Sequence, residues 1–441
     1  MLALILATSL LKHCPRPQDT SINDPKITDS SGLKSKSSVP AETHSKVQYE
    51  QAWKKIRESI SHLYYNRVKR AKQITKFLDD AQPKVLEATN DREFRNAVEA
   101  MIHRFGDSHF AVWTKHDQVF YLFDALARGN KAIKMPTIGA YFVHESVEYN
   151  QHKLKLWCAD MVINESAAAN SGLREGDCIL SANGKPFHPV DSLAASLGKP
   201  LTLDVLRPKN SSNLNAFQTQ FSELKIKVSP ALRNAINEFL IGTLSSEKVI
   251  HYKGKKFAYI HVWTLANPQF ASTLQGAVLG QLYHTDGLIL DIRGGFGGRP
   301  EGILPTFFAP PINLKWQMPN FHHVEHTGYS KPMVLLIDHV ARSAKEVVSQ
   351  MFKDSNRAVL VGQTTAGNVL GTTPMPLASW LYLEMPIMNV FVNGVRLEGK
   401  GVSPNIPAPL GFDAKGKDLT LVKGEKVLYD LIKKERQKTP K

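Results

Sequence analysis

The stretch from Met333 to Phe352 constrains the fold more than any other part of the chain. It opens with the apolar run Met-Val-Leu-Leu-Ile, which indicates a buried strand, and after a short polar corner the apolar residues in 347–352 recur at helical spacing. Ser343 stands at this strand-to-helix corner. There its hydroxyl would lie beside the unpaired N–H of Ala344, which is half of an oxyanion hole. The same serine, taken alone, also fits an ordinary helix N-cap.

The order of sequence patterns predicts a multidomain α+β protein of 441 residues. The predicted parts are a signal-like segment and flexible linker (1–40), an N-terminal helical domain (41–135), a PDZ-like β domain (136–230), an α/β core (231–424), and a C-terminal helix and tail (425–441).

The N-terminal segment predicts the location of the protein. Residues 1–11 form an apolar run that is too short to cross a bilayer comfortably and lacks a basic start, and a stretch rich in Ser, Pro and Lys follows up to Pro40. We interpret this as a signal-like segment and a linker. We therefore expect a periplasmic or secreted protein with an association with the cell envelope.

Composition limits the classes of partner and cofactor. The formal charge of +15 would attract anionic partners, but the lysines are dispersed and no nucleic-acid-binding motif with interleaved aromatic residues is present. We therefore expect no nucleic acid. With three cysteines there is no disulfide framework and no CxxC metal pair, so we expect no metal and no cofactor. Spacing alone leaves a Cys158–Cys178 bridge open.

The region 154–186 has the element order of a small β domain. It predicts a strand, a helix of small residues ending at Gly172, a second strand over 178–181, and a tight hairpin at Asn183–Gly184. This order resembles the PDZ domains of bacterial envelope proteases. A β domain without a ligand is the alternative.

The PDZ resemblance implies a peptide-binding groove. In such a groove the C-terminal end of a peptide adds to the sheet as an extra strand. Backbone N–H groups near Ile138, Gly139 and Ala140 would receive the peptide carboxylate. We therefore expect protein or peptide partners that are bound through C-terminal or extended segments.

A glycine cluster follows another buried strand of the predicted core. The strand over 287–293 breaks into Gly-Gly-Phe-Gly-Gly, which ends in Gly297 and Gly298. Glycines let the backbone turn its N–H groups toward an anion. No Gly-Lys-Ser/Thr follows, so the sequence favours an oxyanion over a nucleotide phosphate.

Several of these motifs together resemble the carboxyl-terminal processing, or tail-specific, serine proteases. The motifs are the Gly-Asp-Ser-His turn at 106–109, the PDZ signature, the strand end Asp-Ile-Arg-Gly-Gly-Phe-Gly-Gly at 291–298, and Ser-Ala-Lys-Glu at 343–346. The resemblance covers about residues 47–410 and implies an α/β core of the crotonase-like type.

The general base of the lysine-dependent members of this family is missing. Their Phe-Gly-Lys turn after the Val-Gly strand is matched here by Ala-Gly-Asn, with Asn368 at the lysine position. Asparagine cannot accept the proton. Lys345 is a weak substitute, because side chains two residues apart on a helix do not face each other.

Another branch, similar to tricorn protease, supplies a different set of groups. Its histidine lies on a Gly-x-Ser-His turn and its glutamate precedes a Gly-Val-x-Pro segment, which match His109 and Glu398. The resemblance implies a serine endopeptidase in which Ser343 is the nucleophile, His109 the base and Glu398 the orienting carboxylate. The N–H groups of Ala344 and Gly297, with Gly298 as the alternative to Gly297, would hold the oxyanion.

Two other functions fit parts of the sequence. A catalytically inactive, protease-like protein that binds peptides or other ligands would explain Asn368, although the presence of His109 and Glu398 argues against it. An acyl-CoA enzyme of the crotonase type has a similar core but leaves the PDZ-like region unexplained. The sequence gives no indication of the oligomeric state.

Overall fold

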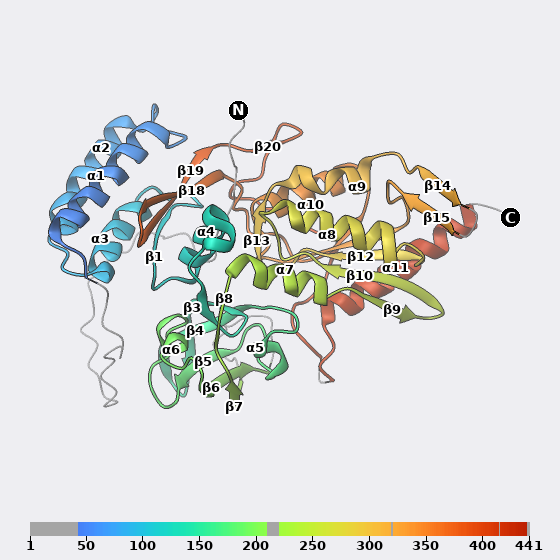
Figure 1. The fold of residues 1–441 in the computed structure, drawn as a ribbon, viewed down its shortest axis with the longest axis horizontal. Coiled ribbons are helices and arrows are strands. Elements are labelled where there is room, and N and C mark those ends of the chain that lie inside the picture. The colour runs from blue at the N-terminus through green and yellow to red at the C-terminus, as the bar shows by residue number, and fades with distance from the viewer. Residues whose placement is uncertain (1–42, 210–219, 319–320, 414, 439–441) are drawn as a thin grey trace.

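The computed structural model describes residues 43–209, 220–318, 321–413 and 415–438 (Figure 1). The predicted signal-like segment and linker, 1–40, therefore lie outside the described residues. Figure 1 shows the N-terminal helices at one end of the molecule and a large sheet with its helices at the other. A smaller sheet lies below them in this view. Within the described ranges, no helix is long and apolar enough to cross a membrane.

Three helices form the N-terminal end: α1 (Lys46–Leu63), α2 (Ala71–Leu86) and α3 (Asp91–His103). Ser45 and Asn90 cap α1 and α3 with their side chains, as expected for helix starts. The helices do not close a core alone. They pack on an antiparallel sheet of β1 (Ala111–Thr114), β19 (Leu381–Met388) and β18 (Gly371–Ala378), and Trp53 and Trp380 share one buried cluster. Residues far apart in sequence thus build this part jointly.

The smaller sheet is five-stranded and antiparallel, in the order β3-β4-β5-β6-β7. Its strands are β3 (Ala140–Tyr149), β4 (His152–Val162), β5 (Cys178–Ala182), β6 (Leu201–Pro208) and β7 (Phe221–Val228), with the short helices α5 (Ala167–Asn170) and α6 (Asp191–Ala194). Gly172 follows α5 with φ of 85°, and Asn183 and Gly184 turn the chain with φ of 50° and 72°. These are the predicted turns.

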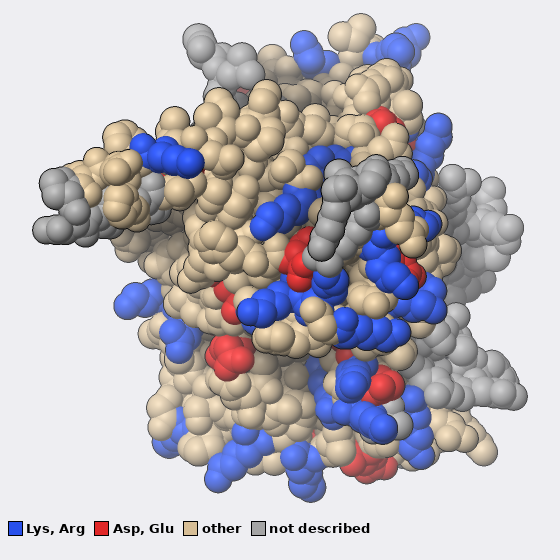
Figure 2. All heavy atoms as spheres, turned by 90° about the vertical axis from the view of Figure 1, so that its right-hand side faces the viewer, with Lys and Arg blue, Asp and Glu red and all other residues tan. Residues whose placement is uncertain are grey.

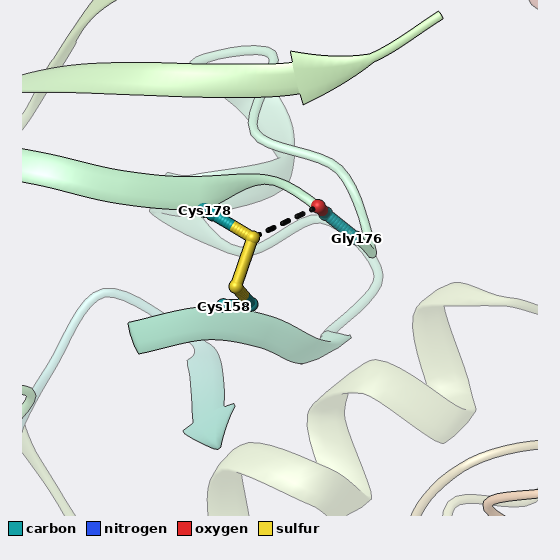
Figure 3. The surroundings of a disulfide bond; sticks show 3 residues. All are labelled: Cys158, Gly176 and Cys178. Atoms are coloured by element: carbon teal, nitrogen blue, oxygen red, sulfur yellow. Dashed lines mark hydrogen bonds between the residues drawn. A yellow bond between two sulfur atoms is a disulfide. The ribbon is translucent and has the colours of Figure 1, made fainter. Parts of the chain in front are cut away.

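A disulfide joins Cys158 on β4 to Cys178 on β5 (Figure 3). The two cysteines are directly opposite each other in the register of this strand pair. The bridge that the sequence left open is therefore present, and it ties two neighbouring strands of the smaller sheet.

The larger sheet has six strands in the order β22-β17-β16-β12-β10-β9. They are β9 (Lys248–Tyr252), β10 (Lys255–His261), β12 (Gly287–Asp291), β16 (Met333–Ile337), β17 (Val359–Gly362) and β22 (Ile406–Pro407). All neighbouring pairs are parallel except β9 with β10. The carboxyl ends of the parallel strands consequently meet at one edge, where β16 leads to Ser343.

Both faces of this sheet are covered, which explains the continuous apolar run of β16. Leu335 packs in the cluster that contains α8 (Pro268–Gly276) and α10 (Ala344–Asp354). Val334 and Leu336 point into the cluster beneath α11 (Leu419–Lys438) on the opposite face. Strands buried on both faces read as unbroken hydrophobic stretches rather than as alternating ones.

Shorter elements connect the three parts. They are α4 (Gln118–Arg128), η1 (Gly129–Lys131), β2 (Met135–Thr137), β8 (Ala231–Arg233), α7 (Ala235–Ser245), β11 (Thr264–Leu265), η2 (Ala277–Gln281), β13 (Phe296–Gly298), η3 (Pro300–Gly302), α9 (Leu304–Phe308), β14 (Asn313–Met318), β15 (Phe321–His326), β20 (Phe391–Val392) and β21 (Val395–Arg396).

Candidate active site

Ser343 lies at the predicted corner between β16 and α10. Asp338 shapes the corner, because its carboxylate accepts the N–H groups of Val340 and Ala341 at 3.1 and 2.7 Å. Ser343 has a left-handed backbone with φ of 58°, which is uncommon for a residue other than glycine. It is 6% exposed and directly precedes the first residue of α10, so the N–H of Ala344 has no partner within the helix.

The glycine cluster after β12 touches this corner. A Cβ atom built on Gly297 would lie 2.6 Å from the Ala344 nitrogen and 2.9 Å from Ser343 Oγ. Only glycine can approach the corner so closely. The Thr264 hydroxyl donates a hydrogen bond to the Gly297 carbonyl at 2.9 Å and so fixes the peptide group. The structure therefore brings Ser343 and both predicted oxyanion donors together.

Glu346 holds the corner in place, a role that the sequence analysis did not assign. Its carboxylate accepts the N–H groups of Ser343 at 3.1 Å, Gly367 at 2.7 Å and Asn368 at 2.9 Å, and the Thr365 hydroxyl at 2.6 Å. Burial raises the pKa of Glu346 to about 7, against the lowering effect of these hydrogen bonds. The Ser-x-x-Glu spacing of a capping box was the available sequence signal.

Position 368 lies beside the serine, where the family resemblance places a lysine. The Ser343 N–H donates to the Asn368 carbonyl at 2.8 Å. Lys345 is completely buried, and its Nζ donates to the Gly294 carbonyl at 2.7 Å. Burial lowers the pKa of Lys345 to about 7. This amine is thus bonded to the strand-end backbone at the glycine cluster.

His109 is buried in its turn, with a left-handed backbone of φ 55°. Its Nδ1 lies 3.0 Å from the Ser108 hydroxyl, whereas Nε2 has no hydrogen-bond partner among the described residues. Burial, together with the positive charge of Arg342, lowers the pKa of His109 to about 3. The imidazole is therefore neutral at physiological pH, and it lies near the residue that precedes Ser343.

Glu398 is half-buried and bonded to the loop that follows Asn368. Its Oε2 accepts the N–H groups of Val369 and Leu370 at 2.6 and 3.0 Å. In the described part of the chain, no hydrogen bond joins Glu398 to His109 or either of them to Ser343. The three predicted triad residues are placed around one region but are not bonded to one another.

A cleft of about 1070 Å³ opens beside the corner that precedes Ser343, and its lining does not include Ser343, His109 or Glu398. Side chains of α3, of β3 and β4, and of the corner before Ser343 line it, among them Trp157, Asp338 and Arg342. Arg342 Nη2 lies 4.0 Å from Asp160 Oδ2 on β4. The cleft therefore runs between the smaller sheet and the serine corner.

The predicted carboxylate-binding loop of the PDZ-like region is buried. Ile138, Gly139 and Ala140 have little or no solvent exposure, and the Gly139 N–H already donates to the Thr137 hydroxyl at 2.8 Å. A Cβ on Gly139 would lie 2.2 Å from Ser166 Cβ, so the loop is closely packed. In this conformation the Gly139 N–H is not free to receive a peptide carboxylate.

A side chain also covers the outer edge of β3, where a peptide strand would add. Gln118, the first residue of α4, donates from Nε2 to the Ala140 carbonyl at 2.9 Å and accepts the Phe142 N–H at 3.0 Å. Nearby, His116 Nδ1 lies 2.9 Å from Asp191 of α6. The Gln118 amide thus bonds the edge as one residue of a paired strand would.

The larger and the smaller sheet each match the model of a known protein family. The family model for peptidase family S41 matches residues 256–408, and that for the PDZ domain matches residues 161–207. The chain carries a peptidase family S41 domain. The first match spans the larger sheet apart from β9, the glycine cluster and the Ser343 corner, and the second lies within the five-stranded sheet. The predicted multidomain α+β fold, with a PDZ-like domain and a protease core, is confirmed.

Individual relatives point to the same family. A carboxy-terminal-processing protease of Bartonella bacilliformis is 24% identical over 294 residues, which are 62% of this chain and 62% of that protein. A tricorn protease homolog of Saccharolobus solfataricus is 28% identical over 168 residues, 36% of this chain and 15% of the homolog. The match thus spans less than two thirds of each of these two relatives.

A solved structure supports the fold. The photosystem II D1 C-terminal processing protease covers 87% of this chain and 96% of its own, with a TM-score of 0.50 and 17% identity. At this identity the match shows the fold, while the S41 family model and the Bartonella relative confirm the predicted resemblance to the carboxyl-terminal processing proteases at the level of the family. Relatives of both the processing and the tricorn kind match, so the comparisons do not choose between the two branches.

Proposed function

We propose that this S41 protein is a serine endopeptidase of the carboxyl-terminal processing type that cleaves protein substrates recruited by its PDZ domain. The observation that carries the proposal is the corner at Ser343. There a left-handed serine at a helix start lies against Gly297 and the N–H of Ala344, which has no partner within the helix. A nucleophile with two backbone donors beside it is the arrangement that acyl transfer requires.

The proposed chemistry uses Ser343, His109 and Glu398. Ser343 Oγ attacks the scissile carbonyl while His109 takes its proton, and the developing oxyanion accepts hydrogen bonds from the N–H groups of Ala344 and Gly297. His109 then protonates the leaving amine. Water attacks the resulting ester by the reverse sequence and releases the acid. Glu398 stabilises the imidazolium that forms in each half of the reaction.

We assign the described conformation to a resting state. His109 Nε2 has no hydrogen-bond partner among the described residues, and its low pKa makes it a poor base. A small movement of the 106–109 turn, which carries His109 toward Glu398, would bring a negative charge near the imidazole and raise its pKa. The left-handed glycine at 106 gives the turn the backbone freedom for such a movement.

Recruitment of a substrate would require a second change, at the edge of β3. A peptide that adds to this edge must displace the Gln118 amide from Ala140 and Phe142. Gln118 is the first residue of α4, and the chain before α4 runs back through β1 to the turn that carries His109. Displacement of Gln118 would therefore disturb one end of this segment. We therefore propose that the PDZ edge and the His109 turn change together.

Hydrolysis of an unstructured polypeptide with a free C-terminus tests the triad. We expect Ser343→Ala and His109→Ala to reduce kcat by at least 10³-fold and Glu398→Gln to reduce it less, as removal of triad members does in other serine peptidases. Lys345→Met keeps the buried volume and should retain most of the activity. Normal turnover by His109→Ala, or inactivation by Lys345→Met in a folded protein, would contradict the assignment of the base.

We also propose that the protein acts in an oxidising compartment, the periplasm or the extracellular space. The Cys158–Cys178 disulfide supports this, because such bonds persist where thiols are not kept reduced. Cell fractionation combined with thiol trapping tests the proposal. Recovery in the cytosol with both thiols free would contradict it.

A further inference from the structure

The larger sheet has a second edge, opposite the catalytic corner. The parallel strands β10, β12 and β16 start there with Lys255, Gly287 and Met333, whereas Ser343 follows the other end of β16. We call this second edge the strand-start edge.

Three separate segments meet at the strand-start edge. The turn between β9 and β10 is one, and the hairpin β14–β15 is another, which attaches where His326 stacks on Tyr283 with ring centroids 3.4 Å apart. The third is the C-terminal half of α11. A Cβ on Gly287 would lie 2.9 Å from Leu428 and 3.3 Å from Ile432, so α11 leaves the sheet at this edge. Figure 1 shows β14, β15 and the end of α11 at the same end of the molecule.

Basic side chains gather at this edge. Lys253 and Lys433 come from different segments, yet their ammonium groups lie 5.5 and 5.7 Å from the same Tyr429 ring. Lys256, three residues after Lys253, and Lys434, directly after Lys433, are exposed. Figure 2, which faces this end of the molecule, shows Lys and Arg side chains clustered across the middle of the surface.

Acidic groups at the edge are fewer and partly paired. Asp286 pairs with Lys255 at 3.6 Å, and Glu325 accepts from the Trp316 indole N–H at 3.3 Å. Lysines therefore remain in excess. The lysines of these segments and of the loops that lead into β12 and β16 are Lys253, Lys255, Lys256, Lys315, Lys331, Lys433 and Lys434, and the acidic residues are Asp286, Glu325, Asp430 and Glu435. Of these lysines, Lys331 is half-buried and donates to the carbonyls of Tyr283 and Thr285.

The hairpin adds exposed apolar side chains to this basic end, on a face that also carries Glu325. Leu314, Trp316 and Met318 alternate along β14 and so share one face. They are 42%, 55% and 57% exposed. A soluble domain seldom leaves three large apolar side chains together in water, whereas tryptophan is enriched at the boundary between lipid and water.

We propose that the strand-start edge docks on an anionic phospholipid bilayer. The lysines of the β9–β10 turn and α11 would bind the headgroups, and Leu314, Trp316 and Met318 would enter the interface. Charge complementarity favours this occupant over a second copy of the chain, because two copies would bring the same excess of lysines together. The docked protein would hold its catalytic corner away from the bilayer.

Vesicle co-sedimentation of the full chain tests the proposal. Binding to vesicles of phosphatidylglycerol and phosphatidylcholine is expected, with loss in high salt and weak binding to phosphatidylcholine alone. The double variant Lys253→Gln/Lys433→Gln should weaken the binding roughly 30-fold, since each lysine near such a surface contributes on the order of 1 kcal/mol. The matched control is Lys54→Gln/Lys76→Gln, which removes the same charge from exposed positions on α1 and α2.

Tryptophan fluorescence gives a second readout of the hairpin. Lipids brominated in their acyl chains should quench part of the fluorescence of the native chain, and Trp316→Phe should abolish that part. Equal vesicle binding by the Lys253→Gln/Lys433→Gln variant and its control would overturn the proposal. This is also the result expected if residues 1–11 alone bind the vesicles. Loss of self-association in Trp316→Phe with unchanged vesicle binding would also overturn it, in favour of an interface between copies.

Discussion

Replacement of Gly297 by alanine is the sharpest structural perturbation of the proposed oxyanion hole. The new Cβ would lie 2.6 Å from the Ala344 nitrogen, 2.7 Å from Ser343 Cβ and 2.9 Å from Ser343 Oγ. Contacts between such atoms below about 3 Å are repulsive, so residue 297 and the start of α10 must separate by several tenths of an ångström. Both N–H donors would then miss the oxyanion. Loss of one well-placed donor typically reduces kcat by about 10²–10³-fold, or roughly 3–4 kcal/mol.

The assay is steady-state hydrolysis of a fluorogenic unstructured peptide, with urea unfolding of the same samples. Gly297→Ala should lower kcat at least about 100-fold while KM changes little, because the donors act on the transition state. Overpacking should cost about 1–3 kcal/mol of stability. The matched control is Gly276→Ala at the end of α8, where a Cβ meets nothing within 4 Å, and activity should be retained. A Gly297→Ala protein with kcat within threefold of the native value would refute the geometry.

Three other variants probe the environment of the site. When pH falls from 7 to 5, the native protein should lose about 2 kcal/mol more unfolding free energy than the His109→Asn variant. The reason is that the pKa of His109 is lowered to about 3 in the folded protein, whereas it is about 6.5 in the unfolded chain. Between these two pH values only the unfolded histidine takes up a proton, so the contribution of His109 to stability is complete above pH about 6.5 and shrinks as pH falls toward 3. Urea unfolding at both pH values checks this, and equal losses would contradict it. Gln118→Ala, made in a Ser343→Ala background, should bind a labelled peptide about tenfold more tightly in a fluorescence polarisation assay. The reason is that the two hydrogen bonds of the Gln118 amide no longer compete with the peptide for the β3 edge. An unchanged affinity would show that the Gln118 amide does not compete with the peptide. Glu346→Gln should cost about 2–4 kcal/mol in urea unfolding, since one amide oxygen cannot accept four donors, and native-like stability would contradict that role.

The fold was predictable wherever local sequence determines structure. The unbroken apolar run of β16 is a consequence of a sheet covered on both faces, and the left-handed turns at Gly172 and Asn183–Gly184 need residues of their type. Tertiary arrangements were not accessible in this way. The N-terminal helices complete their core with Trp380, more than three hundred residues downstream of Trp53. Spacing alone likewise could not place Cys158 opposite Cys178, because that depends on strand register.

In the candidate site, too, the parts that local sequence determines were predictable and the parts that tertiary packing determines were not. The corner that joins Ser343, Ala344 and Gly297 follows from a strand, a glycine cluster and a helix start, all within one parallel sheet. The orientation of His109 does not, because its turn belongs to a different part of the molecule and its ring is buried near Arg342. The Gln118 amide on the β3 edge also escaped the sequence, since nothing local marks a side chain that bonds a distant strand.

Reaction with a fluorophosphonate probe, followed by intact mass and peptide mapping, tests the central claim most directly. An activated serine hydroxyl reacts covalently with this probe, and an ordinary helix cap does not. With an unstructured polypeptide present to occupy the PDZ edge, we expect one adduct per chain, located on Ser343, formed at a rate that falls sharply in His109→Ala and is nearly unchanged in Lys345→Met. Peptide hydrolysis without an adduct on Ser343 would contradict the assignment of Ser343 as the nucleophile. The absence of both an adduct and hydrolysis in the folded full chain would contradict the peptidase function, and would instead indicate a peptide-binding protein without catalysis.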